Sequence, residues 1–307
     1  MQMFDHSQID FTVKKSALFY DNLEYTPSLG DRMEGLPYGI GMLLKREDTN
    51  EPIAIVTDGY TPVQYMDIVV KVEEALELSG LDMTDAEFQT NVFNNGSQLE
   101  LRAKFPAHAL TVDKGDKVIP TLVGRTSHDG TWANNFMMGA WRNFCWNLLV
   151  SGSKYAYMYG KHTKGFNVVS FAQKVRNAGE YISGEGLQEM QGWYNKEVSR
   201  GQVINLFSNT LAKHRDNVSR KNKPNQVMLS NLMKVWDEEN RHIHGRSHYE
   251  AYAQRTTGSL WTAYNAATYW SSHVKPRKDS SPHNVMVTRE DKVRKMLHSP
   301  EWLALAA

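Results

Sequence analysis

Cationic and aromatic side chains alternate in one short stretch of the sequence, SGSKYAYMYGKHTKG (151–165). Lysine ammonium groups neutralise phosphates, and each tyrosine ring that stacks on an unpaired base contributes about 1–3 kcal/mol. The pattern therefore predicts contacts with single-stranded nucleic acid. The alternative is a strand whose tyrosines pack on a sheet, since tyrosine is common in strands. The side chains expected to contact the nucleic acid here are Lys154, Tyr155, Tyr157, Lys161, His162 and Lys164.

A second basic stretch, RHIHGRSHYE (241–250), holds three histidines and a glutamate that could ligate a metal ion. Two histidines at i and i+2 could share an ion on an extended backbone. However, Gly245 and the neighbouring arginines favour a solvated basic loop. We therefore predict that Arg241 and Arg246 contact phosphates, and we predict no metal site.

Enzyme signatures are absent from the sequence. It has no glycine-rich phosphate loop, no His-Glu-x-x-His, no paired-cysteine metal spacing and no Gly-x-Ser-x-Gly elbow. A histidine-based hydrolase built from His128, His162 and His242 ranks last, because no nucleophile or carboxylate recurs at usable spacing. We predict no catalytic residue and no cofactor. Cys145, the only cysteine, stands between two aromatic residues and is expected to be a buried small hydrophobe.

The net charge of +1 conceals a division between the two halves of the chain. Residues 1–150 carry 12 Lys and Arg against 21 Asp and Glu, and residues 151–307 carry 23 against 13. The basic half predicts a polyanion partner. Alternatively, the halves attract each other within one molecule or between neighbours in an oligomer.

Composition and sequence patterns predict a cytoplasmic protein that does not enter the membrane. No apolar run approaches the roughly 18–20 residues that span a bilayer. The N-terminal sequence MQMFDHSQIDFTVKK does not have the pattern of a secretory signal, and one cysteine fits a reducing compartment.

The elements that must position these side chains predict an α+β fold. Residues 1–50 are expected to be loop-rich, because glycines and prolines are closely spaced there. Residues 51–165 are expected to form an α+β core, and residues 166–307 a helical, basic region that packs on or extends this core. A buried strand at 52–57 leads into a helix with Thr61 as N-cap and Gly80 at its end.

An antiparallel meander follows this helix in the prediction. Asn95-Gly96 marks a hairpin, His128-Asp129-Gly130 marks a second turn, and Pro120 suggests an edge strand or a bulge. The meander is expected to bury one face and expose the other. From Arg142 onward we predict helices, including one opened by Thr288 and another by Ser299.

Four ordered blocks give the chain its resemblance to a known family: TDGYTPVQYMDIVVKVEEAL (57–76), VIPTLVGRTSHDGTWANNFMMGAWRNFCWNLLV (118–150), GKHTKGF (160–166) and TGSLWTAYNAATYWSSH (257–273). They resemble the phage and plasmid proteins grouped under domain of unknown function 932. Ser259, Trp270 and Ser272 depart from the family pattern. The matching residues are Tyr60, Pro62, Val63, Gln64, Ser127, His128, Asp129, Gly130, Arg142, Cys145, Asn147, Leu148, His162, Thr163, Trp261, Ala263, Tyr264, Asn265, Ala266, Thr268, Tyr269 and His273.

The resemblance implies a protein of a phage or mobile element that acts in the cytoplasm of a bacterial host. The order of elements is also similar to that of phage single-strand annealing proteins of the RecT and Red-beta type. That similarity implies a homo-oligomer that anneals single-stranded DNA without ATP, with a phage exonuclease or a host single-strand binding protein as further partners.

Under this hypothesis Arg125, His128 and Arg142 face the DNA, while the aromatic residues around them form the core between sheet and helices. The alternative function is a phage protein whose acidic first half mimics DNA and neutralises a host protein. The expected core residues are Trp132, Phe136, Met138, Trp141, Phe144 and Trp146.

Overall fold

The computed structural model of the chain describes residues 2–19, 37–113, 116–142, 147–149, 157–160, 168–213, 224–244, 256–273 and 282–307. Contacts between residues divide the chain into two compact units. Unit 1 comprises Met1–Phe105, Leu122–Met138 and Tyr155–Asn177, and unit 2 comprises Pro106–Thr121, Gly139–Lys154 and Ala178–Ala307. The division predicted at residues 50 and 165 stays a prediction.

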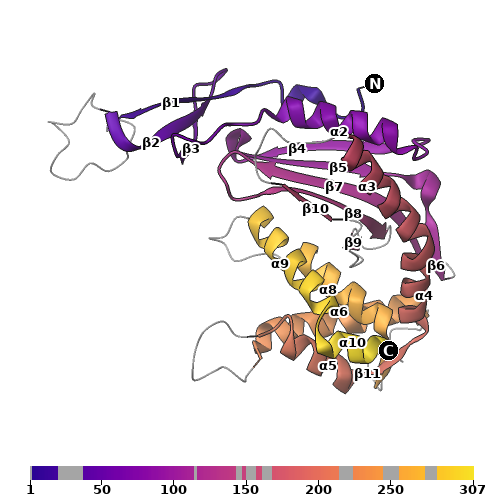
Figure 1. Cartoon of the computed structure of the whole chain (residues 1–307). Helices are drawn as coiled ribbons and strands as arrows, with labels where there is room; N and C mark the ends of the chain where they lie inside the picture. The colour runs from indigo at the N-terminus through magenta and orange to yellow at the C-terminus, as the bar shows by residue number, and fades with distance from the viewer. Residues whose placement is uncertain are drawn as a thin grey trace. The chain divides into compact units, whose positions relative to one another are not determined.

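The fold is α+β, as the sequence predicts: antiparallel strands dominate the first half of the chain and helices the second (Figure 1). Short 3₁₀ turns at His6–Gln8, Asn94–Gly96 and Pro106–His108 connect elements of the first half.

Unit 1 contains a three-stranded antiparallel sheet of β1 (Val13–Phe19), β2 (Pro37–Arg46) and β3 (Pro52–Val56). The expectation of a merely loop-rich beginning was therefore wrong. Glycine suits β2 because a Cβ at Gly41 would lie only 2.9 Å from Cγ2 of Ile55 in β3. Strand β3 is an edge strand, and its Ile55 is exposed, so this strand is not buried as expected.

Helix α2 (Tyr65–Ser79) follows β3 and begins later than predicted. The N-cap is Gln64 rather than Thr61, and its side chain does not cap the helix. Instead, the Gln64 amide accepts from the backbone N–H of Val13 at 2.9 Å and donates to its carbonyl at 3.0 Å. Gly80 ends the helix at φ 72°, as predicted.

The larger sheet has the order β10-β8-β7-β5-β4, with β6 paired to β7 and β9 paired to β8. Asn94, Asn95 and Gly96 adopt positive φ between β4 and β5, which confirms the hairpin. Strand β7 lies inside the order, so the edge position suggested by Pro120 was wrong. The strands are β4 (Glu87–Phe93), β5 (Gln98–Lys104), β6 (Leu110–Asp113), β7 (Asp116–Ser127), β8 (Asn134–Arg142), β9 (Asn147–Leu149) and β10 (Tyr157–Gly160).

Neither face of the central strands is open to water. In β5 the apolar Leu99, Leu101 and Ala103 are buried, but so are Glu100 and Lys104 on the opposite face. The expectation of one wet face was wrong. The predicted core residues Trp132, Phe136 and Met138 are buried, and Phe136 packs edge-on against Phe171 of α3.

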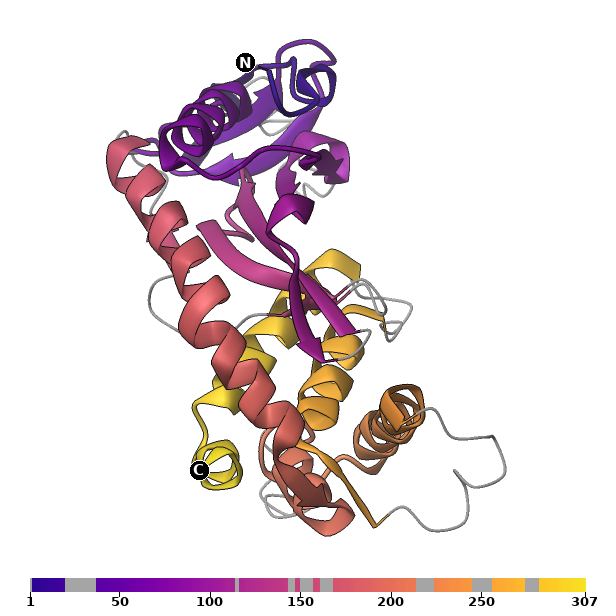
Figure 2. The ribbon, with the colours of Figure 1, turned by 90° about the vertical axis from the view of Figure 1, so that its right-hand side faces the viewer.

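Helices follow, with α3 (Val168–Tyr181), a π-helical turn (Ile182–Gly186) and α4 (Leu187–Asn195) forming one continuous helical run (Figure 2). The remaining elements are α5 (Arg200–Asn209), α6 (Gln226–His244), α8 (Leu260–His273), α9 (Pro282–Leu297), α10 (Pro300–Ala306), and the paired short strands β11 (Glu197–Ser199) and β12 (Thr257–Ser259). The chain after Arg142 is therefore not purely helical. Ser299 caps α10 as predicted, whereas α9 begins at Pro282 and not at Thr288.

Helix α8 forms the centre of unit 2 and is buried along almost its whole length. The ring of Tyr264 lies 5.1 Å from that of Trp193 in α4, and Trp193 meets Trp302 of α10 edge-on at 5.1 Å. These aromatic contacts tie three helices of unit 2 together.

Candidate functional site

Arg125, a predicted DNA contact, is buried in unit 1. Its side chain in β7 is 3% exposed, and its Nε donates to Oε2 of Glu100 in β5 at 2.7 Å. Arg102 binds the other oxygen of Glu100 at 2.8 Å. Burial raises the pKa of the Glu100 carboxyl, but the two arginines outweigh this effect and hold the pKa below its usual range. The expectation that Arg125 faces DNA was wrong, because its charge is used within the sheet.

His128 is also buried, with 1% of its surface exposed. Its ring stacks on Tyr65 of α2 with centroids 4.1 Å apart, and its backbone N–H donates to the carbonyl of Ser97 at 2.7 Å. The predicted DNA-facing position of His128 was therefore wrong. The stacking on an aromatic side chain of α2 fixes the imidazole inside unit 1.

The turn predicted at Ser127–Gly130 is present and is held by Asp129. The Asp129 carboxylate accepts from the Ser97 hydroxyl at 2.9 Å and from the Thr131 backbone N–H at 2.9 Å. Burial and this carboxylate raise the pKa of the Tyr60 and Tyr65 phenols. The phenols thus stay protonated at neutral pH.

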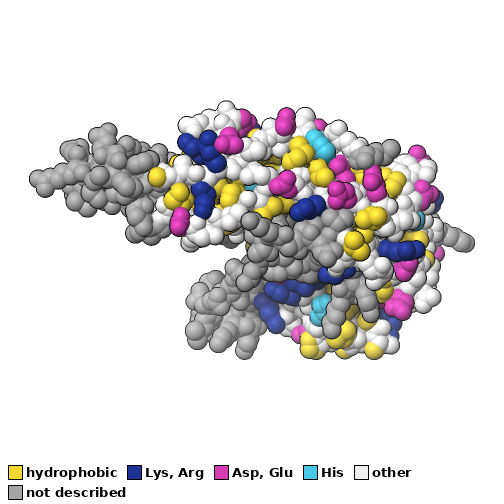
Figure 3. Space-filling model, turned by 45° about the horizontal axis from the view of Figure 1, so that its top comes forward, with side chains coloured by type: hydrophobic (Ala, Val, Ile, Leu, Met, Phe, Trp, Pro, Cys, Tyr) yellow, Lys and Arg dark blue, Asp and Glu magenta, His cyan; other side chains and the backbone are white. Residues whose placement is uncertain are grey.

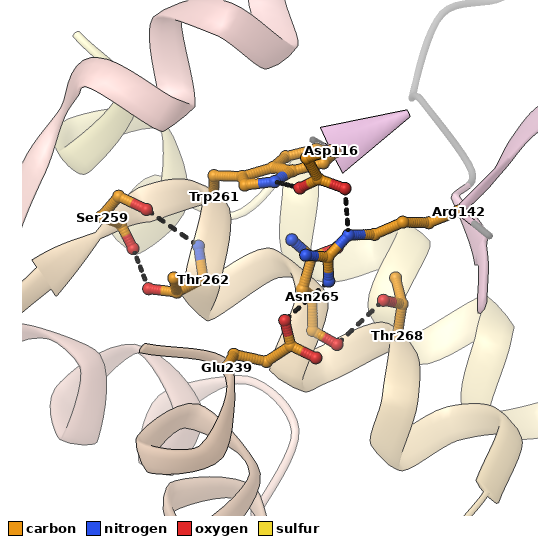
Figure 4. A network of polar contacts seen from close by, with 8 residues as sticks. All are labelled: Asp116, Arg142, Glu239, Ser259, Trp261, Thr262, Asn265 and Thr268. Carbon is orange, nitrogen blue, oxygen red and sulfur yellow. Dashed lines mark hydrogen bonds and ion pairs between the residues drawn. The ribbon is translucent and has the colours of Figure 1, made fainter. Parts of the chain in front are cut away.

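Arg142, the third predicted DNA contact of this region, lies at the centre of a buried network in unit 2 (Figure 4). Its Nε donates to Asp116 at 2.6 Å and its Nη1 donates to Glu239 at 2.6 Å. The indole N–H of Trp261 donates to the second oxygen of Asp116 at 2.8 Å. Because Arg142 is 3% exposed and holds two carboxylates, its predicted contact with DNA was wrong.

The same network fixes the beginning of α8 and its middle turn. The backbone N–H of Thr262 donates to the Ser259 hydroxyl at 3.1 Å, and the Thr262 hydroxyl donates to the Ser259 carbonyl at 2.6 Å. The Thr268 hydroxyl donates to the carbonyl of Asn265 at 3.0 Å. Residues from two blocks of the family resemblance, Arg142 and Trp261, thus meet through Asp116 in a structural cluster.

Asp116, Glu239 and Glu100 were missed by the sequence analysis. Asp116 and Trp261 are 145 positions apart, and Arg142 and Glu239 are 97 apart, so no local pattern joins them. For Glu100 a signal exists: Glu100 and Arg102 alternate on one face of the predicted strand. Alternating opposite charges in an internal strand indicate an ion-pair ladder.

The other predicted contacts fall mostly outside the described residues. Lys154, Tyr155, Lys161, His162, Lys164 and Arg246 lie there, as do Cys145, Phe144 and Trp146. Tyr157 lies in strand β10, paired with Met137 of β8, and Arg241 lies in α6. The side chains of Tyr157, Arg241 and Trp141 are not among those described.

The charge division of the sequence is also a division between the structural units. Unit 1 has 13 Lys and Arg against 19 Asp and Glu, and unit 2 has 22 against 15. Within the described part of unit 2, Lys117, Lys196, Lys213 and Lys234 are exposed and form no ion pair. Arg200, by contrast, is paired with Asp237, and Lys295 is paired with Asp291. The four lysines are thus available to an anionic ligand.

The residues that the structure describes contain neither a group of metal-ligating side chains nor a membrane-spanning helix. No three His, Cys, Asp or Glu side chains gather there in a group that could hold a metal ion. The helices of this part are all too short or too polar to cross a bilayer.

One comparison with known proteins gives a match. The family described as Domain of unknown function (DUF932) matches residues 52–297, from β3 to the end of α9. No curated protein and no solved structure matches the chain.

Proposed function

This chain belongs to the family of domain of unknown function 932, and we propose that it binds single-stranded DNA on its basic unit and anneals complementary strands. One observation carries the proposal: unit 2 has 22 Lys and Arg against 15 Asp and Glu, whereas unit 1 is acidic. A unit with excess positive charge attracts a polyanion and releases its condensed counterions on binding.

Exposed lysines are the groups that would contact phosphates, because the buried arginines are already paired. Lys117 lies on β7, Lys196 follows α4, and Lys213 follows α5. In addition, the segments 214–223, 245–255 and 274–281 of the sequence contain nine Lys and Arg against three Asp and Glu. We propose further contacts from the sequence segment 151–165, of which residues 151–154 belong to unit 2 and residues 155–165 to unit 1; its lysines and tyrosines have the composition of a single-strand groove.

Annealing on such a surface would be positional. Cations screen the repulsion between two phosphate backbones, and stacked tyrosines hold the bases apart until a complementary strand pairs with them. The sequence lacks a phosphate-binding loop, which agrees with annealing that uses no ATP. The proposed setting is phage recombination in the bacterial cytoplasm, with several copies on one strand and with a phage exonuclease or a host single-strand binding protein as partners.

Binding is tested by fluorescence anisotropy of a labelled oligonucleotide over a range of salt concentrations. We expect log K to fall linearly with log salt, with a slope of about −0.7 for each phosphate contacted. The variant K117E/K196E/K213E should bind more weakly and with a flatter slope, and so should K154E/K161E/K164E. The control K14E/K45E/K71E changes the net charge equally but lies within residues 1–105 of unit 1, away from the proposed contacts in the sequence. Dissociation constants above about 1 mM at low salt, or equal losses in test and control variants, would contradict the proposal.

Annealing is tested separately by mixing two complementary labelled oligonucleotides without any nucleoside triphosphate. The wild-type protein should accelerate duplex formation, and K117E/K196E/K213E should lose most of this acceleration. If the protein binds single strands tightly but does not accelerate duplex formation, it is a single-strand binding protein, and the proposed annealing activity is contradicted.

The acidic unit 1 favours a second candidate, a protein that binds and neutralises a host protein. Asp67 and Glu74 are exposed on α2, beside the exposed Leu78. This candidate predicts no binding of single-stranded DNA at low salt, and it predicts that charge neutralisation on α2 removes the effect on the host.

A further inference from the structure

Helix α2 carries an outer face in which carboxylates surround exposed apolar side chains. Leu78 is 62% exposed and Val70 is also exposed, and Asp67, Glu74 and Glu77 are exposed on the same side of the helix. With 3.6 residues per turn, these five positions fall within an arc of about 100°. We call them the α2 face. Figure 3 shows acidic and hydrophobic side chains intermingled on the side of the molecule that carries α2.

The opposite side of α2 is fully used within unit 1. Ile68, Val69, Val72 and Leu76 are buried there. The acidic surface also continues beyond the helix, since Asp82 and Asp85 are exposed in the segment that leads into β4. The α2 face is therefore an acidic surface with an apolar anchor, and such a surface fits a partner with the opposite charge.

Unit 2 presents a surface of the complementary kind on α6. Val227 is 73% exposed and Lys234 is exposed, and they are seven positions apart, which places both on the same side of the helix. Ser230 and Asn231 stand between them and are exposed. We call Val227, Ser230, Asn231 and Lys234 the α6 face. It offers a cation and an apolar side chain where the α2 face offers carboxylates and Leu78.

We infer that the α2 face of one copy docks on the α6 face of a second copy. The inference deepens the proposed function, on which it rests for the need to place several copies on one strand. Because two different surfaces meet, the contact is head-to-tail and generates a ring or an open filament rather than a symmetric dimer. Charge complementarity carries the choice of partner: the acidic unit 1 and the basic unit 2 have opposite excess charge in every copy.

The test uses the full chain without DNA, in sedimentation velocity at low and at high salt. Variant A combines Glu74→Gln with Leu78→Ser, and variant B combines Lys234→Gln with Val227→Ser. The control combines Glu51→Gln with Ile55→Ser, an exposed acidic and an exposed apolar residue of unit 1 away from α2. These side chains are all exposed, so folding should be preserved, and circular dichroism checks it.

The wild-type protein and the control should associate in a concentration-dependent and salt-sensitive way, and variants A and B should each be monomeric. An equimolar mixture of A and B should form dimers but nothing larger, because B retains its α2 face, A retains its α6 face, and only this one pairing survives. Three results would overturn the inference: a monomeric wild type at all concentrations, association of A or B alone at the level of the wild type, or a mixture that stays monomeric. If the wild type is monomeric and its α2 face binds a different, basic protein, the inference is overturned as well.

The failure of this inference and that of the proposed function are distinguishable. Oligonucleotide binding is measured at protein concentrations below those at which the copies associate. If association follows the expected pattern but DNA does not bind, the proposed function fails alone. If DNA binds and the mixture of A and B stays monomeric, the docking contact fails alone.

Discussion

Arg142 and the two carboxylates that it binds form a set in which each charge depends on the others. Asp116 and Glu239 are held by one guanidinium, and all three groups are almost completely buried. Taking charges out of water costs several kcal/mol for each ion, so the arrangement is stable only while the partners remain in place. Residue type suggested a DNA contact for Arg142, but its partners come from distant parts of the sequence.

Replacement of Arg142 by Met should therefore lower the free energy of unfolding by about 3–5 kcal/mol, because it leaves two carboxylates buried without a cation. Urea denaturation followed by circular dichroism measures this loss. The control Lys117→Met removes an exposed cation of the same sheet and should change stability by less than about 0.5 kcal/mol. A loss below about 1 kcal/mol for Arg142→Met would show that the network is not what holds this part of unit 2 together.

The Glu100 carboxylate gives unit 1 a stability that depends on pH. Its pKa in the folded protein lies below the ordinary value of 4.5, since Arg125 and Arg102 outweigh the effect of burial. A group with a lowered folded pKa stabilises the protein above its unfolded pKa, and this contribution is lost as pH falls through the folded pKa. The wild type should therefore lose stability below about pH 4.5.

In Glu100→Gln this part of the pH dependence should be absent. The variant should be less stable than the wild type by about 3 kcal/mol at neutral pH, and the difference should shrink steadily as the pH is lowered below about 4.5. Urea unfolding between neutral pH and about pH 3 measures both curves. Parallel curves for the two proteins would be inconsistent with an ionised Glu100 between the two arginines. The exposed Glu51→Gln serves as the control.

At the scale of elements, the ends of helices and turns were predictable where one residue determines the backbone. Gly80 ends α2 and Asn95-Gly96 forms the hairpin, because positive φ values favour Gly and Asn. The beginning of α2 was not predictable, since Gln64 binds the backbone of Val13, 51 positions away, instead of its own helix. The burial of both faces of β5 could not be predicted from the sequence either, because Arg125, the partner of Glu100, lies on another strand.

Replacement of glycine by alanine should lower the stability of the protein at Gly80, which ends α2, and raise it at Gly192, which lies inside α4. Gly80 has φ 72°, so Gly80→Ala should destabilise the protein by about 1 kcal/mol. Gly192 lies inside α4 with open space around it, so Gly192→Ala should stabilise by about 0.5–1 kcal/mol. Thermal unfolding of the two variants beside the wild type measures the difference. If Gly80→Ala raises the midpoint, the conformation assigned to Gly80 is wrong, and if Gly192→Ala lowers it, the open space assigned around Gly192 is wrong.

At the scale of the whole molecule, the sequence predicted the α+β fold class, the family and the charge division, and these three follow from long patterns. Individual DNA contacts were predicted less well. Three of the eleven, Arg125, His128 and Arg142, are buried, and the structure does not describe the side chains of the other eight. The net charge of a unit is a sum over many residues and does not depend on the role of any one of them. The role of a single arginine, by contrast, depends on its tertiary partners.

The most direct test of the account asks which unit a single strand occupies. Hydrogen exchange of the full chain, with and without a saturating oligonucleotide at low salt, answers this question. The account predicts slower exchange on DNA binding in peptides of unit 2, including those that contain Lys117, Lys196 and Lys213. Slower exchange confined to residues 1–105, or no change anywhere at saturation, would contradict it.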